Sequence, residues 1–235
     1  MKKYLIVLIS FISINVFAQL PGGAFSIGGG PTVGYQGINF DDLNSMLTTS
    51  GIPALKNGVV YFGGGGFIDI PFKSFKWLRI GGFGRGFTAK TSGTTAGITK
   101  SAIVDYSEGG ITLDYVFRFG PVLDVTLGSS FATGEYKINL HQSGAVAPTW
   151  TNTWNGASTG FSRNLKTRMY TAQPTLGVGG KLAAFIYAKL NAGYQLSSHG
   201  DWKVEDEVII TGVPEGIKPD GFNVNLTINV GLFFR

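Results

Sequence analysis

The residues best suited to acid–base chemistry are two histidines, His141 and His199. His199 lies in the stretch "SSHGD", beside Ser197, Ser198 and Asp201, and a Ser–His pair is what a lipid acyl hydrolase or acyltransferase would use as nucleophile and base. Neighbouring residues on a strand point to opposite faces, however, and a triad is defined by geometry rather than by proximity in sequence. We therefore expect a polar loop entrance here and no catalytic residue.

Two further patterns could bind ions or phosphates. Asp201, Glu205, Asp206 and Glu207 offer the oxygen ligands that Ca²⁺ prefers, but they lack the spacing and the glycine of an EF-hand loop. The stretch "GVGGKL" contains the Gly-Lys pair of a phosphate-binding loop, but Thr175 stands at the position of its first glycine. Solvated loop residues and strand glycines explain both patterns, so we expect no metal and no cofactor.

The elements that must position any site follow a two-residue period. In "FNVNLTINVGLFFR" every even-numbered residue from Phe222 to Leu232 is apolar and every odd-numbered one is small or polar. This alternation predicts a strand with two unlike faces. Eight segments show the period, and they span residues 24–36, 59–72, 77–90, 101–119, 122–140, 168–181, 185–198 and 222–235.

The connections between these segments alternate in length. The short ones are "KSFK", "GP" and "LAA", and the long ones span residues 37–58, 141–167 and 200–221. The first long connection contains "FDDLNSML", which predicts a short helix capped by Asp41 or Asp42. Short turns at one end and long loops at the other indicate an antiparallel up-and-down transmembrane β-barrel of eight strands.

The composition indicates a membrane environment for this barrel. Charged residues make up 14% of the chain, against about 25% in soluble domains. With the apolar faces turned to lipid, aromatic residues should form a girdle at each interface. The expected girdle at the turn end contains Phe25, Phe72, Phe75, Trp77, Phe117, Phe119, Phe185, Tyr187, Phe233 and Phe234, and that at the loop end contains Tyr35, Phe62, Phe87, Tyr136, Tyr170 and Tyr194.

Charged side chains fall on the opposite faces of the same segments. Facing lipid, each Lys or Arg would cost about 2–4 kcal/mol at mid-depth, so these residues are expected to line the lumen. The expected lumen charge network is Asp69, Arg79, Arg85, Asp114, Arg118, Asp124, Lys181 and Lys189. Side chains just fill an eight-stranded barrel, so the charges should pair, with Asp69 and Asp114 as the closest partners of Arg79.

The first residues have the pattern of a secretory signal peptide. Lys2 and Lys3 precede an apolar stretch, and Val16-Phe17-Ala18 forms a cleavage site, which predicts a signal peptide over residues 1–18 and a barrel domain over residues 19–235. Removal of the two lysines takes the formal charge from +5 to +3. That small excess, with no basic run, argues against nucleic-acid binding.

These features together resemble the small outer-membrane β-barrel proteins of Gram-negative-type bacteria, over the whole of residues 19–235. The final "GLFFR" is similar to the aromatic-ended strand that barrel-assembly machinery recognises, although Arg235 follows the last aromatic here. The resemblance implies a cell-envelope protein of the bacterial outer membrane, in contact with its lipid and with the assembly machinery. We expect a monomer.

The resemblance leaves the biological role open. The leading hypothesis is a non-enzymatic structural, adhesive or recognition role through the long extracellular loops. There Trp150, Trp154 and Trp202 could anchor an unidentified extracellular partner or pack the loops against each other. The first alternative is a narrow, porin-like pore or a carrier for small, including hydrophobic, molecules. Further alternatives are an outer-leaflet lipid-modifying enzyme and a soluble secreted β-barrel.

Overall fold

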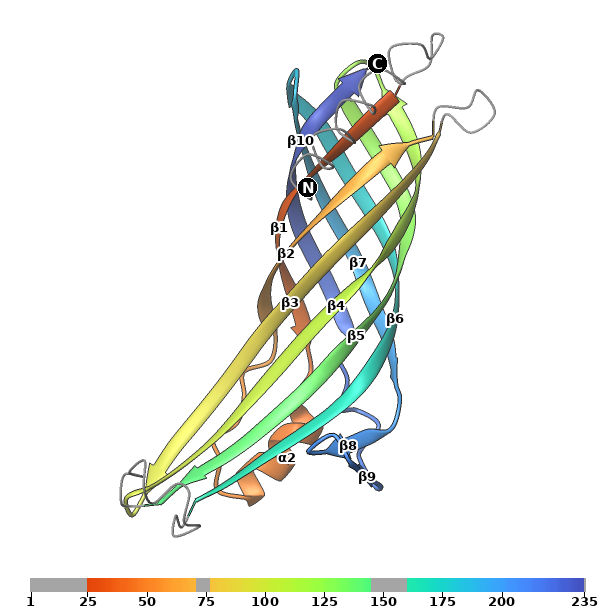
Figure 1. Cartoon of the computed structure of the whole chain (residues 1–235). Coiled ribbons are helices and arrows are strands. Elements are labelled where there is room, and N and C mark those ends of the chain that lie inside the picture. The colour runs from red at the N-terminus through yellow and green to blue at the C-terminus, as the bar shows by residue number, and fades with distance from the viewer. Residues whose placement is uncertain (1–24, 71–76, 145–159, 235) are drawn as a thin grey trace, which may run out of the picture.

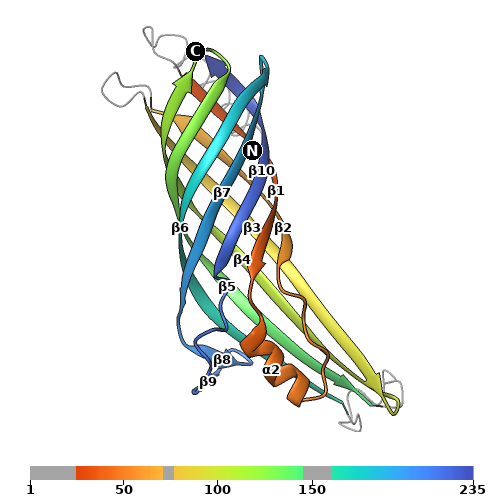
Figure 2. The ribbon, with the colours of Figure 1, turned by 180° about the vertical axis from the view of Figure 1, so that it is seen from behind.

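A computed structural model describes residues 25–70, 77–144 and 160–234. Eight long strands form an antiparallel sheet in which β1 pairs with β10 and β5 pairs with β6, so the sheet closes into a barrel (Figures 1 and 2). The barrel strands are β1 Phe25–Ile38, β2 Val59–Asp69, β3 Leu78–Thr95, β4 Ile98–Phe119, β5 Leu123–Ser143, β6 Phe161–Ala183, β7 Ile186–His199 and β10 Gly221–Phe234. The predicted fold class and all eight predicted strands are confirmed.

Three short elements lie in the long connections. Helix α2 (Asp41–Thr49) follows β1, and strands β8 (Trp202–Val204) and β9 (Val208–Ile210) lie between β7 and β10. All three sit at the end of the barrel opposite the end of β10 (Figure 1). Among the described residues, no helix has both the length and the apolarity needed to cross a membrane.

The final strand shows which face of the sheet points outward. Phe222, Leu226 and Val230 are exposed on β10, whereas Asn223 and Asn229 are buried. The same alternation continues around the wall, with Leu190, Leu176, Leu127 and Leu113 also exposed. A polar interior inside an apolar outer band is the organisation of a transmembrane β-barrel. The soluble-barrel alternative is therefore wrong.

The aromatic girdles are only partly as predicted. Phe117, Phe119, Phe185 and Phe234 are exposed at the turn end, and Tyr35, Phe62, Tyr170 and Tyr194 are exposed nearer the loops. Phe25, Phe87, Tyr136, Tyr187 and Phe233 are instead buried. The last four lie on the inner face by their positions in the alternation, where they pack with lumen side chains, so nearness to a strand end was not a sufficient criterion. Phe72 and Phe75 lie outside the described residues.

Four neighbouring strands run further than predicted at the loop end. The last pair between β2 and β3 is Phe62 with Gly86, but β3 continues to Thr95 against β4. In the same way β6 begins at Phe161, whereas its pairing with β7 begins at Met169. Strands β3 to β6 therefore continue past the closed wall as a four-stranded sheet, which Figure 1 shows reaching toward the lower left. The Thr-, Ser- and Gly-rich segment near residue 95, which the sequence predicts as a connection of moderate length between two strands, is instead part of this sheet.

The inner side of this extension is covered by its own apolar core. Helix α2 contributes Leu43 and Leu47, β5 contributes Ile138, and Trp202 of β8 packs in the same cluster. We call this end of the molecule the cap, and define it as residues 39–58, 87–106, 136–144, 160–168 and 200–220. The helix was predicted at the right place, but neither Asp41 nor Asp42 is its N-cap, because Phe40 occupies that position and makes no side-chain capping hydrogen bond.

Candidate functional site

A cluster centred on Arg79 crosses the lumen near the turn end. Arg79 of β3 is 1% exposed, and its Nε donates to Asp69 of β2 at 2.7 Å while its Nη2 donates to Asp124 of β5 at 3.2 Å. Its Nη1 donates to the Tyr187 hydroxyl, which in turn donates to Asp124, both at 3.1 Å. Arg118 of β4 donates to the other oxygen of Asp69 at 2.9 Å. We call these five residues the lower cluster.

Aromatic rings form the remaining contacts of the Arg79 guanidinium. Its central carbon lies 4.0 Å from the centre of the Phe67 ring and 5.3 Å from that of Tyr187. Phe233 of β10 stacks on Phe67, with ring centres 6.2 Å apart. A desolvated cation over a ring face is attracted by the ring quadrupole, so these rings add to the carboxylates in compensating the buried charge.

A second cluster crosses the lumen nearer the cap and is centred on Arg85 of β3. Its Nε donates to Glu108 of β4. Its Nη2 donates to Gln173 of β6 at 2.8 Å and to Gln195 of β7 at 2.7 Å, and its Nη1 donates to the Tyr61 hydroxyl at 3.3 Å. We call these five residues the upper cluster. The guanidinium thus contacts groups from four other strands.

The acceptors of the upper cluster are themselves satisfied by further lumen residues. The second oxygen of Glu108 accepts from the hydroxyls of Tyr106 at 2.6 Å and Thr171 at 2.7 Å. The Tyr61 hydroxyl donates to Asn223 of β10 at 3.0 Å. A buried polar network is stable when its members are paired in this way, because each unpaired buried group would bear its full desolvation cost. The network therefore fixes the distance between opposite walls.

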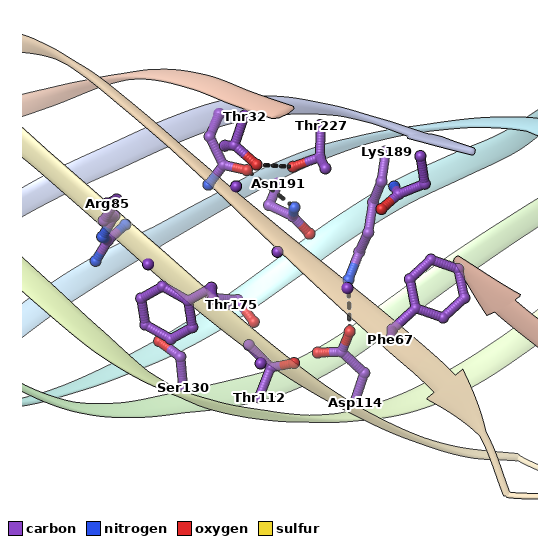
Figure 3. Close-up of a pocket in the computed structure, with 18 of the residues that line it drawn as sticks. Thr32, Phe67, Arg85, Thr112, Asp114, Ser130, Thr175, Lys189, Asn191 and Thr227 are labelled. Atoms are coloured by element: carbon purple, nitrogen blue, oxygen red, sulfur yellow. Dashed lines mark hydrogen bonds and ion pairs between the residues drawn. The ribbon is translucent and has the colours of Figure 1, made fainter. Parts of the chain in front are cut away.

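The space between the two clusters is a polar chamber with a volume of about 120 Å³. Figure 3 shows Thr32, Thr112, Thr175 and Asn191 around it. Lys189 Nζ donates to Asp114 at 2.5 Å within the chamber, and Thr32 and Thr227 share a hydrogen bond of 2.8 Å between β1 and β10. The chamber has room for a few water molecules, given about 30 Å³ for each.

The prediction that Asp114 is one of the closest partners of Arg79 is wrong. Asp114 of β4 lies directly opposite Arg79 in the β3–β4 ladder. Its carboxylate nevertheless pairs with Lys189 of β7. The reason is the narrow bore, which lets side chains on strands that are not neighbours meet across the lumen. Arg79 reaches Asp124 by the same route.

The other predicted lumen residues are placed as follows. Asp69, Arg79, Arg118 and Asp124 lie together in the lower cluster, and Arg85 lies apart from them in the upper cluster. Lys181 does not join either: its Nζ donates to the Phe233 backbone carbonyl at 2.9 Å, at the turn end of the barrel. The single network expected from the sequence is therefore two separate clusters and one separate ion pair.

Several members of the clusters were missed from the sequence. Glu108 has the same even numbering on β4 as Asp114, and it is the register neighbour of Arg85, so strand parity alone could have placed it. Tyr187 was assigned to a girdle, although Lys189 two residues later was placed in the lumen. Gln173 and Gln195 carry no charge, and nothing in the local sequence distinguishes them from other polar residues.

The serine and the histidine of "SSHGD" that were considered as nucleophile and base each contact another group. Ser197 Oγ donates to Asp220, and His199 Nδ1 lies 2.8 Å from the Gly200 carbonyl oxygen. Because the serine and the histidine each have a different partner, they do not form a nucleophile–base pair. Within the described part of the chain, no three His, Cys, Asp or Glu side chains are grouped so as to hold a metal ion.

The expectation of an exposed tryptophan anchor is wrong for Trp202, which is 3% exposed. Its ring centre lies 5.9 Å from that of Tyr136 in an edge arrangement and 6.2 Å from that of His199. Trp202 therefore packs the β8–β9 segment onto the barrel extension, which was the second interpretation of the loop tryptophans. Trp150 and Trp154 lie outside the described residues.

Comparisons with known proteins give structural likenesses but no family. No family model matches the chain, and no curated protein sequence matches it significantly. One solved structure that it resembles is the attachment invasion locus protein Ail of Yersinia pestis, in complex with the heparin analogue sucrose octasulfate. The two chains are 12% identical with a TM-score of 0.36, and the alignment covers 90% of this chain and 99% of Ail. CarO of Acinetobacter baumannii is 12% identical, with a TM-score of 0.35 and coverage of 88% and 97%. The outer membrane protease OmpT from Escherichia coli is 8% identical, with a TM-score of 0.36 and coverage of 92% and 97%.

Proposed function

We propose that this chain is an integral barrel of the bacterial outer membrane that does not conduct solutes through its lumen and that acts in recognition through its cap. The observation that carries the proposal is the contact between opposite walls. Strands β3 and β7 are four strands apart in either direction around the barrel, yet Arg79 bonds Tyr187 and Arg85 bonds Gln195. Two such contacts, at different depths in the lumen, argue against the alternative of a narrow conducting pore.

The direction of the barrel in the membrane follows from its connections. In outer-membrane barrels the short turns face the periplasm and the long connections face outward. By this rule the β4–β5 turn at Gly120 lies in the periplasm, and α2, β8 and β9 lie outside the cell. The cap is thus the part of the described chain that an extracellular partner would meet first.

The cap has the properties of a presented surface. Strands β3 to β6 hold it rigidly, because their hydrogen-bond ladders continue from the membrane-spanning wall without a break. Strand β9 is the last strand of the sheet order, so one of its edges has no partner strand among the described residues, and its Val208 and Ile209 are 63% and 55% exposed. An unpaired edge with exposed apolar side chains outside the membrane favours contact with another molecule.

Site-specific photo-crosslinking in intact cells tests recognition at the cap. A photoreactive amino acid at Val208 should form adducts with extracellular material, whereas the same group at Leu182, which is similarly exposed next to the β6–β7 turn, should not. Addition of a protease-treated or glycan-stripped extracellular fraction would then identify the class of the partner. Identical adducts at both positions would contradict a recognition role for the cap.

A further inference from the structure

Beyond the closed wall, one edge of β3 has no partner strand in the described part of the chain. β3 pairs with β2 only as far as Gly86, whereas its other side stays paired with β4 to Thr95. No backbone hydrogen bond between described residues joins residues 87–95 to the connection between α2 and β2. Pro53 of that connection lies instead on the inner face of β3, where a Cβ atom at Gly93 would meet it at 2.8 Å. We call the unpaired side of residues 87–95 the open edge.

The sequence of the open edge suits strand pairing. It reads "FTAKTSGTT", with four threonines, no proline and one charged residue, and threonine is enriched in strands. Native proteins usually protect a long edge with several charges, a proline, a bulge or a covering element. Here Lys90 is the only such device. The edge is about 30 Å long at ~3.4 Å per residue, which is enough to hold a second strand of the same length.

The open edge is complementary to itself when two copies pair antiparallel. A pairing centred on Thr91, the middle of the edge, gives every residue from 87 to 95 a partner. Lys90 then lies opposite Ser92 of the second copy, and Thr88 lies opposite Thr94. Threonine pairs directly across two strands are favourable, whereas like charges directly opposite are destabilising. A pairing centred on Lys90 would place the two lysines opposite each other, so the single charge helps to select the register.

The charge of Lys90 is also balanced within its own chain. Asp105 of β4 is paired with Thr88 in the β3–β4 ladder and accepts a hydrogen bond from the Thr88 hydroxyl at 2.6 Å. Asp105 is therefore a diagonal neighbour of Lys90 on the same face, within reach of a long side chain. In the paired state the two Lys90 side chains are diagonal to each other, and each has this carboxylate on its other side.

A hollow beside the open edge provides room for the end of the second copy. Its volume is about 590 Å³, and its walls include Val60 and Phe62 of β2 and Phe87 of β3. It lies where β2 and β3 separate. A pairing centred on Thr91 brings Thr95 of the second copy opposite Phe87, so the β3–β4 turn of the second copy comes to this hollow.

We propose that the open edge binds the open edge of a second copy of this protein, antiparallel and centred on Thr91, and that the second copy lies in a facing membrane. β3 runs from the membrane-spanning wall toward the cap (Figure 1). A β3 strand that runs the opposite way therefore comes from a barrel on the far side of the contact. The contact joins two membranes, and each copy remains a monomer in its own. It rests on the proposed function only in placing the cap outside the cell.

The size of the edge sets the strength of this contact. One pair of nine-residue strands makes an interface at the low end of the range for specific complexes, below about 1,200 Å². A single pair is thus weak and reversible. Many pairs between the same two membranes act together, because each one formed raises the effective concentration of the next. A test on isolated pairs must therefore trap them covalently.

Disulfide trapping in lipid nanodiscs with one barrel each tests the contact, since the chain has no native cysteine. Under oxidation, Thr91→Cys should give a dimer on a non-reducing gel, because residue 91 lies opposite itself. Thr95→Cys should not, because its two copies would lie about 27 Å apart at ~3.4 Å per residue. Thr95 is more exposed than Thr91, so random collision would favour the opposite result. Electron microscopy should show the trapped discs in pairs with the barrels facing each other.

Charge variants of Thr91→Cys test the register. Ser92→Lys puts a lysine opposite each Lys90 and should lower the rate of dimer formation about two- to thirtyfold, the combined effect of two opposed like-charge pairs. Asn139→Lys adds the same charge to the same face on β5, two strands from the edge, and should leave the rate unchanged. Lys90→Glu added to Ser92→Lys turns both pairs into attractive ones and should restore it. Heat-modifiable gel mobility verifies that each variant is folded.

Three results would overturn the contact. The first is no dimer from Thr91→Cys, which would leave the open edge to a strand from another protein. The second is equal trapping of Thr91→Cys and Thr95→Cys, and the third is a rate that Ser92→Lys does not change. None of these results bears on conductance or on crosslinking at Val208, so failure of the self-contact is distinguishable from failure of the proposed function.

Discussion

Lys189 and Asp114 form an ion pair of 2.5 Å across the lumen, although β7 and β4 are not neighbours in the wall. Both side chains are largely buried, at 11% and 5% exposed. Burial of two charges is costly unless each compensates the other, and removal of one partner leaves the second uncompensated. The pair therefore acts as a tie between two sides of the chamber.

Lys189→Met should destabilise the barrel by about 3–5 kcal/mol, because Asp114 then remains as a buried unpaired carboxylate. Asp114→Leu should cost a similar amount. The double variant should recover most of the loss, since both charges are gone. The midpoint of urea unfolding in lipid vesicles measures all three, and additive losses in the double variant would show that the pair is not coupled.

The assignment of the outer face predicts a difference between adjacent residues of β10. Leu226 is exposed on the outer face, whereas Asn225 bonds Asn191 and Asn223 inside the lumen. Leu226→Arg should cost about 2–4 kcal/mol of insertion energy, as expected for a cation at mid-depth in lipid. Asn225→Arg should have a smaller effect on insertion. Heat-modifiable gel mobility reports the inserted fraction, and equal losses would contradict the assigned faces.

The topology can be tested by cysteine labelling, because the chain has no native cysteine. Val208→Cys in the cap should react with a membrane-impermeant maleimide on intact cells. Pro121→Cys in the exposed β4–β5 turn should react only after the outer membrane is opened. The reverse order of accessibility would place the cap in the periplasm.

Inward-facing glycines leave the space that the lumen side chains occupy. A Cβ atom at Gly34 would collide with the ring of Tyr61, a member of the upper cluster, whereas a Cβ at Gly82 on the outer face meets nothing closer than 3.7 Å. Gly34→Ala should therefore lower the unfolding free energy by about 1–3 kcal/mol, as overpacking does. Gly82→Ala is the control and should change it little. Equal urea midpoints for the two variants would argue against a packed lumen.

The sequence predicts the wall of this barrel well because each residue of a strand has only two possible directions. The alternation from Phe222 to Leu232 was sufficient to assign the outer and inner faces of β10. It predicted the ends of the strands less well. The segment near Thr95 is rich in residues typical of loops, and only the pairing of β3 with β4 makes it a strand.

The contacts inside the lumen were less accessible from sequence. Strand parity places Arg79, Asp114 and Lys189 inside the barrel, but it does not state which of them meet, because that depends on the bore and on the stagger of the strands. The assumption that charges pair between adjacent strands predicted the Arg79–Asp69 pair correctly, but it missed the pair between Asp114 and Lys189, whose strands are not adjacent. The cap was beyond prediction for a related reason, since Trp202 is buried in a cluster whose members are far apart in sequence, from Ile38 to Ile217.

Single-channel recording in planar lipid bilayers tests the central claim of a closed lumen most directly. Correctly folded protein, verified by heat-modifiable gel mobility, should insert without producing discrete conductance steps, because the lower and upper clusters each join opposite walls. The variant with both Arg79→Ala and Arg85→Ala should produce steps wherever it inserts, since both barriers are then removed. Steady, reproducible conductance steps from the unaltered protein would contradict the account and favour a narrow pore.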